Sequence, residues 1–193
     1  VRYVEFYRPD LIPNLTTARS PQIHSGGMIK NYWSRLAKIN PKNIVVVSIM
    51  PCTAKKYEAS RPELKVNGLA PVDFVLTTRE LAFMIKKGGI NFSKLKGVKA
   101  DQPLGEASGA AVIYGGSGGV MESALRTAQA RICGKDSKLC KTRLDFMDTR
   151  GMEGFREATV EMGKVKLRVA VVNGMKHAQE FLKDYKNYDY IEI

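Results

Sequence analysis

Hydrophobic positions in the first half of the chain form two short, β-branched runs. The run Asn43–Met50 is almost continuously apolar, which is typical of a strand buried on both faces of a sheet. Val72–Leu76 predicts a second strand. The segment that follows has capping-box spacing, with Thr77 and Glu80 three residues apart, so we expect a helix that extends to about Lys87 and ends at a Gly-Gly pair.

The second half of the chain repeats this alternation of strands and helices. Ala110–Tyr114 predicts a third strand, and Val120–Ile132 predicts the helix after it. Lys166–Val172 predicts a fourth strand, followed by an amphipathic helix from about residue 177 to residue 186, and Tyr188–Ile193 alternates as a final strand does. Strands separated by helices predict an α/β fold, with parallel strands and flanking helices.

In such a fold, ligands bind at the carboxyl ends of the strands, so we expect chemistry after Met50, Tyr114 and Val172. Cys52 lies directly after the first predicted strand, and Lys55 can favour its thiolate form. A thiolate serves as a nucleophile or as an iron ligand, but nucleophilic use needs a paired base, and neither histidine shows a signature for it. The residues alone leave open whether Cys52 is functional or a buried structural thiol.

Glycine-rich backbone surrounds the third predicted strand, at Gly105–Gly109 and at Gly115–Gly119. Unpaired N–H groups at the start of a helix can hold an anion, although the stretch lacks both the lysine of a Walker loop and a dinucleotide fingerprint. A tight turn between strand and helix is the simpler interpretation. In the same way, Ser20 followed by Pro21 is an ordinary N-cap and first helical residue.

Composition narrows the class of protein. The 193 residues are 44% hydrophobic and 26% charged, as in globular domains, and 31 basic against 19 acidic residues give a net charge of +12. The basic residues are scattered and no nucleic-acid motif accompanies them, so we predict no nucleic-acid binding. We also expect no membrane span, because no apolar run reaches the roughly 18 residues needed.

Three unevenly spaced cysteines argue against a disulfide scaffold and for a reducing, cytoplasmic location. Cys133 and Cys140 belong to a segment, Cys133–Arg143, that predicts a polar surface loop, and we expect both to be ordinary thiols.

The same segments, in the same order, resemble the catalytic domain of iron-only (FeFe) hydrogenases. The family pattern M-P-C-x-x-K-x-x-E is met in full, and four further stretches match over essentially the whole chain. The matching residues are Met50, Pro51, Cys52, Lys55 and Glu58 of the pattern, with Leu15–Gln22, Val72–Leu81, Gly105–Gly109 and Gly115–Arg126. The resemblance implies a two-lobed domain, with approximate lobes 1–105 and 106–193.

In that family an H-cluster lies between the two lobes. It consists of a cubane 4Fe–4S unit joined through a cysteine sulfur to a two-iron site that carries CO and CN⁻. The resemblance implies that Cys52 is one cubane ligand and that Lys55 donates a hydrogen bond to one cyanide. It further implies that Ser20 and Pro21 line the other cyanide.

The resemblance implies supporting roles for the remaining matched positions. Near the cluster, Met50 would pack against the carbonyl ligands, Pro51 would shape the turn, and Glu58 would lie at a polar, water-lined edge. Tyr114 would form an aromatic wall. Three glycines would let the backbone approach the two-iron site where a Cβ would collide, and these are Gly115, Gly118 and Gly119.

The resemblance also implies that parts of the functional unit lie outside these residues. The family supplies further cluster cysteines, and a proton-transferring thiol, from loops that we expect before Val1 and after Ile193. We therefore expect a fragment without a catalytic residue of its own, inactive until those segments complete it. The parent would interconvert H₂ with protons and electrons, and would pass electrons to accessory iron–sulfur domains or a ferredoxin.

Two other functions remain open at this stage. One is a non-catalytic, hydrogenase-like iron–sulfur assembly protein, which shares the cysteine scaffold but does not turn over H₂. It also fits a sensory domain that reports H₂ to a linked partner domain.

Overall fold

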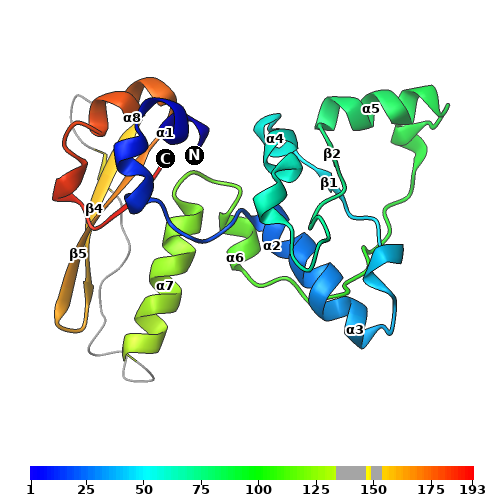
Figure 1. Cartoon of the computed structure of the whole chain (residues 1–193), viewed down its shortest axis with the longest axis horizontal. Helices are drawn as coiled ribbons and strands as arrows, with labels where there is room; N and C mark the ends of the chain where they lie inside the picture. Colours follow the sequence, from blue (N-terminus) through cyan, green and yellow to red (C-terminus); the bar gives the residue numbers. More distant parts are fainter. Residues whose placement is uncertain (134–146, 149–153) are drawn as a thin grey trace. The chain divides into compact units, whose positions relative to one another are not determined.

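The structure is a computed structural model that describes residues 1–133, 147–148 and 154–193. The chain forms two compact units, Val1–Gly105 and Glu106–Ile193, which are described separately (Figure 1). The predicted surface loop Cys133–Arg143 lies mostly outside the described residues, as does Cys140.

The first unit contains five α-helices and a two-stranded parallel sheet among its described elements. Helix α2 continues through a π-helical segment, Ile29–Trp33, directly into α3. The elements are α1 (Arg2–Tyr7), α2 (Pro21–Met28), α3 (Ser34–Leu36), β1 (Val47–Ile49), α4 (Ala54–Ser60), β2 (Phe74–Leu76) and α5 (Thr78–Lys87), with 3₁₀ turns at Pro9–Asn14, Pro41–Asn43, Pro62–Leu64 and Phe92–Lys94.

Helix α5 confirms the prediction made from its capping box. The Thr77 hydroxyl accepts the Glu80 N–H at 3.1 Å, and the Glu80 carboxylate accepts the Thr77 N–H at 2.7 Å. The helix ends at Lys87, with Gly88 as its C-cap. Two of the N–H groups at its start are therefore satisfied locally.

The first strand is shorter and more exposed than predicted. A 3₁₀ turn occupies the start of the predicted run, and β1 covers only Val47–Ile49. Val47 and Ile49 are about half exposed, at 49% and 48%. The expectation of a strand buried on both faces is wrong for these residues, since the Ser48 face contacts α2 while the opposite face has no layer over it within the described unit. The predicted parallel pairing with β2 is confirmed.

A buried ion pair fixes the start of β1. Lys30, only 4% exposed, donates to the Asp73 carboxylate at 2.7 Å and to the Ala70 carbonyl at 2.8 Å. The other oxygen of Asp73 accepts the Val46 N–H at 2.7 Å. One carboxylate thus links the π-helical segment to the residue immediately before β1.

The described residues of the second unit form three helices and a four-stranded mixed sheet of order β3-β4-β5-β6. The β4–β5 pair is antiparallel and the β5–β6 pair is parallel. Its elements are α6 (Ala110–Ile113), α7 (Gly119–Cys133), β3 (Met147–Asp148), β4 (Phe155–Met162), β5 (Val165–Val172), α8 (Met175–Phe181), a 3₁₀ turn (Tyr185–Asn187) and β6 (Tyr190–Glu192).

Strand β5 is the centre of this unit. Val169 and Val171 pack in one buried cluster with Met121 of α7, and Ala170 and Val172 pack in another with Phe181 of α8. Because alternate side chains of a strand point to opposite faces, β5 is buried on both faces near its end, and the strand predicted at Lys166–Val172 is confirmed.

Two predictions for this unit are wrong. Ala110–Tyr114 is the short helix α6 and not a strand, because a run of five apolar residues fits either structure and the two alanines favour helix. Strand β4 was not predicted, and it makes the sheet mixed where an all-parallel arrangement was expected. The predicted helix 177–186 begins earlier and ends sooner, as α8.

Strand β6 and helix α7 confirm their predictions. Over the described ranges, no helix has the length and apolar character needed to cross a membrane.

Candidate functional site

The loop between β1 and α4 exposes a thiol. The Met50 N–H donates to the Leu76 carbonyl at 2.8 Å and extends the parallel pairing to the strand's end. Cys52 follows as a free, exposed cysteine, and its carbonyl accepts the Lys55 N–H at 3.2 Å. The buried structural alternative for Cys52 is therefore wrong, since its side chain is accessible to a ligand.

Behind this loop, one carboxylate collects three hydrogen bonds. Oε2 of Glu58 accepts from the Ser20 hydroxyl at 2.8 Å, from the Gln22 amide at 2.9 Å and from the Lys55 ammonium at 3.0 Å. Partial burial acts to raise the pKa of Glu58, but the hydrogen bonds from Ser20, Lys55 and Gln22 hold it below its ordinary value. The site therefore contains an ionised carboxylate next to an ammonium.

The Ser20 hydroxyl does not cap helix α2. Ser20 occupies the N-cap position and Pro21 the first turn, as predicted, but the side chain makes no capping hydrogen bond. It turns instead to Glu58 on α4, so the Ser-Pro segment links α2 to α4.

Gln22 is a site residue that sequence reasoning missed. Its side chain is buried, with the amide NH₂ donating to the Lys55 carbonyl at 3.1 Å and to Glu58, while its oxygen accepts the Ser48 hydroxyl at 2.9 Å. One amide thereby joins α2, α4 and β1. In the sequence, the sign that Gln22 belongs to the site is its position directly after Ser20-Pro21. Only the fold shows that its side chain faces inward.

In the second unit, the glycine turn before α7 has strict steric requirements. Gly118 has φ +85°, and a Cβ on Gly119 would lie 1.7 Å from the Ile113 carbonyl oxygen. At Gly115 a Cβ would meet only the Val112 oxygen, at an ordinary 3.6 Å. The need for glycine is thus sterically evident at positions 118 and 119 and not at position 115.

The N–H groups that could hold an anion at this turn are occupied by the protein itself. The two carboxylate oxygens of Glu192 accept the N–H groups of Gly118 at 2.8 Å and Met121 at 2.7 Å. Glu192 therefore satisfies the first turn of α7 and complements its dipole. Nearby, Tyr114 is 44% exposed, and its hydroxyl lies 3.4 Å from that of Ser123.

The structure thus brings together four predicted positions of the first unit: Ser20, Lys55 and Glu58 by hydrogen bonds, and Cys52 on the adjoining loop. Pro51 is exposed and Met50 half-buried in the same loop. Tyr114, Gly115, Gly118 and Gly119 belong to the second unit. Within residues 1–133, 147–148 and 154–193, no group of three or more His, Cys, Asp or Glu side chains could hold a metal ion.

The donor set fits part of an iron–sulfur group with anionic ligands. Cys52 offers one accessible sulfur, and Lys55 keeps N–H donors beyond the one it gives to Glu58. An iron–sulfur cubane is held by four thiolates, so this thiol can supply one corner of it.

Comparisons with known proteins find similarity along the whole chain. Residues 1–193 match the protein family described as "Iron only hydrogenase large subunit, C-terminal domain". The chain is 46% identical over 96% of its length to the periplasmic [Fe] hydrogenase large subunit of Nitratidesulfovibrio vulgaris, and 43% identical over its full length to iron hydrogenase 1 of Clostridium pasteurianum. It is also 31% identical over 95% of its length to cytosolic iron-sulfur assembly component 3 of Rattus norvegicus.

A solved hydrogenase structure has a fold similar to that of this chain. The chain superposes on an apo FeFe-hydrogenase of Chlamydomonas reinhardtii with a TM-score of 0.80 and 34% identity, over 99% of this chain and 55% of that one. The chain spans 43% and 34% of the length of the two bacterial relatives. The α/β fold class expected from the sequence is confirmed by this similarity.

Proposed function

This chain belongs to the iron-only hydrogenase large subunit family, in its C-terminal domain, and we propose that it forms part of a domain that holds an H-cluster and interconverts H₂ with protons and electrons. The observation that carries the proposal is the exposed Cys52 thiol at the end of β1, three residues before an ammonium that retains free N–H donors. When bound, the cluster supplies the iron at which H₂ reacts and the electron store beside it.

The first unit supplies the groups that contact the cluster. Cys52 provides one thiolate to the cubane, and Lys55 donates a charge-assisted hydrogen bond to a cyanide ligand. Ser20 and Pro21 line the second cyanide. Met50 packs near the carbonyl ligands, Pro51 shapes the turn, and Glu58 lies at the polar edge of the site.

The second unit supplies close backbone approach. In this proposal Gly115, Gly118 and Gly119 let the backbone approach the two-iron site where a Cβ would collide, and Tyr114 forms an aromatic wall. In this proposal the two units of the chain are the two lobes of the hydrogenase domain, at 1–105 and 106–193.

Polypeptide beyond these 193 residues completes the site. The relatives are more than twice as long as this chain, and we assign to such additional segments the other three cubane ligands and the proton-transferring cysteine. Electrons then pass to accessory iron–sulfur domains or to an acidic ferredoxin, which the net charge of +12 favours. We place the protein in the cytoplasm, although relatives carry both periplasmic and cytosolic names.

A second candidate function follows from the relatives. The similarity to the iron-sulfur assembly component is a reason to consider a protein that holds iron–sulfur clusters without H₂ turnover. The higher identity to hydrogenases, and the presence of Lys55 three residues after the cysteine, favour the hydrogenase. An H₂-sensing domain would share the same site.

The test replaces Cys52 in a longer protein that contains this chain and is matured anaerobically with its cluster. We expect wild type to show infrared bands of CO and CN⁻, Cys52→Ala to lose them, and the control Cys133→Ala to keep them. Bound iron without such bands in wild type would establish the assembly function instead. Unchanged bands in Cys52→Ala would refute the role of Cys52.

A further inference from the structure

Glu58 accepts hydrogen bonds from two of the donors of the site. Its Oε2 atom receives hydrogen bonds from Ser20 and Lys55, the two side chains that the proposed function directs toward cyanides. The Ser20 hydroxyl has a single proton and gives it to Glu58, so it has none left to donate. The Lys55 ammonium has three protons, gives one to Glu58 and retains two.

The carboxylate is held in place from a buried position. Gln22, 5% exposed, donates to Glu58 and to the Lys55 carbonyl, while Ser48 of β1 donates to the Gln22 oxygen. All three hydrogen-bonding groups of this amide are therefore used, and its orientation is fixed by two helices and a strand. Glu58 cannot turn away without leaving a buried amide proton unpaired.

Charge gives Glu58 a second effect. Its carboxylate lies 3.0 Å from the Lys55 ammonium, with the two side chains 23% and 31% exposed. At such partly buried positions an ion pair is screened less than it is in bulk water, so the carboxylate offsets much of the positive charge that Lys55 would present to a bound anion.

From these contacts we propose that Glu58 is a positioning residue, which reserves Lys55 as the side-chain donor to an anionic iron ligand, occupies the Ser20 hydroxyl and moderates the charge of the ammonium. This inference rests on the proposed function, because it concerns the environment of a bound cluster. It replaces the expectation that Glu58 merely lines a watery edge, and it assigns Ser20 a contact to protein and not a side-chain hydrogen bond to cyanide.

The test uses Glu58→Gln in a longer, cluster-loaded parent protein, read by infrared spectroscopy and redox titration. The neutral amide leaves the Lys55 charge without its counter-ion, and its oxygen is a weaker acceptor for the Ser20 hydroxyl than a carboxylate is. We therefore expect the CN⁻ bands to shift and the cluster's reduction potential to rise. Glu58→Asp keeps the charge but moves it away from Lys55 by the length of one methylene, so we expect a smaller shift in the same direction. This second variant tests the inference even if the glutamine variant folds poorly.

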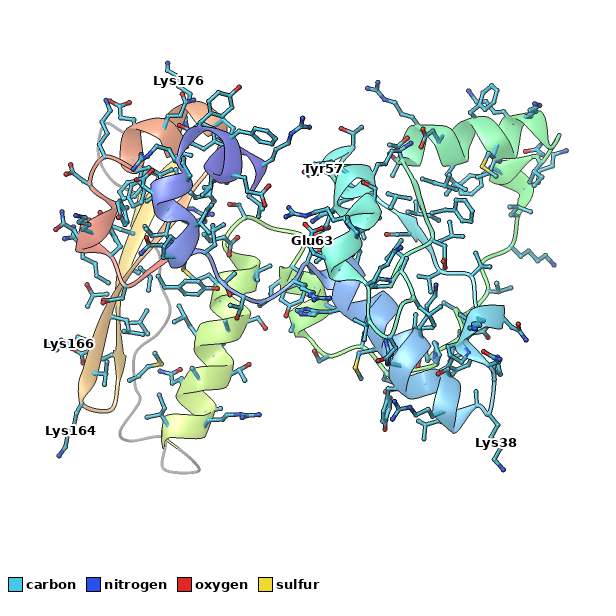
Figure 2. The ribbon with its side chains drawn as sticks, in the orientation of Figure 1. Lys38, Tyr57, Glu63, Lys164, Lys166 and Lys176 are labelled. Atoms are coloured by element: carbon cyan, nitrogen blue, oxygen red, sulfur yellow. The ribbon has the colours of Figure 1, made fainter. Side chains whose placement is uncertain are left out.

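The matched control is Glu63→Gln, which changes a carboxylate of the same unit that pairs with Arg61 and not with Ser20, Gln22 or Lys55 (Figure 2). We expect its bands and potential to equal those of wild type. Bands and potentials of both Glu58 variants that coincide with wild type would overturn the inference and leave the proposed function standing. Wild-type protein without CO and CN⁻ bands would overturn both together.

Discussion

The contact between Gly119 and helix α6 yields a sharp prediction about stability. A Cβ at this position would lie 1.7 Å from the Ile113 carbonyl oxygen and 2.5 Å from its carbon. Carbon–oxygen contacts are normally about 3.3 Å or more, so Gly119→Ala requires the backbone segments to separate by roughly 1.5 Å. The partner is main chain and cannot be relieved by a rotamer change.

The expected cost can be bounded. Alanine in place of glycine within a helix gains up to about 1 kcal/mol, while overpacking costs about 1–3 kcal/mol or more. Because the clash here involves backbone, we expect Gly119→Ala to lower the free energy of unfolding by about 2 kcal/mol net. With a typical urea dependence, that corresponds to a fall of about 1 M in the midpoint of urea unfolding.

Gly116→Ala is the control, because its Cβ would meet the same Ile113 oxygen at an ordinary 3.7 Å. We expect that variant to stay within about 0.5 kcal/mol of wild type. Urea unfolding of both variants is monitored by circular dichroism. Equal midpoints for Gly119→Ala and Gly116→Ala would refute the reasoning from close approach.

Two further predictions concern charged groups of the first unit. The hydrogen bonds from Lys56 and from the Thr77 N–H lower the pKa of Glu80 from 4.5 to about 2. The contribution of Glu80 to stability is therefore complete above pH 4.5 and is lost as the pH falls toward 2. We expect Glu80→Gln to flatten the pH dependence of the melting temperature in that window, and an unchanged slope would contradict this. Lys30→Met leaves the Asp73 carboxylate without its buried cation, and we expect it to lower the free energy of unfolding in urea by about 3 kcal/mol. The double variant Lys30→Met/Asp73→Asn should recover part of this loss. A double variant no more stable than the single one would argue against the ion pair as the cause.

The sequence predicted elements whose signals are local. The capping box of α5, the long helix α7 and the apolar run of β5 each carry their pattern within their own residues, and the structure confirms all three elements. Strand β4 carries charged residues at several positions and is specified by its pairing with β5, which no local pattern encodes. The short apolar run of α6 fits two structures, and its surroundings decide between them.

The candidate site divides in the same way. The position of Cys52 after a strand followed from the pattern of β1, and so did the expectation that chemistry gathers there. The shared carboxylate oxygen of Glu58 and the buried Gln22 depend on how α2 and α4 meet, which is a long-range property of the fold. The roles assigned to the individual site residues stay predictions until the cluster-loaded protein is measured.

The pairing of Glu192 with the glycine turn has a consequence for synthesis on the ribosome. The Gly118 N–H and its acceptor are 74 residues apart, and the acceptor lies on the last strand of the second unit. As translation proceeds, α7 emerges long before the carboxylate that completes its first turn. The fold of this unit is therefore completed only after β6 has been synthesised. Variants that slow the pairing of β6 should leave the nascent chain accessible to chaperones for longer.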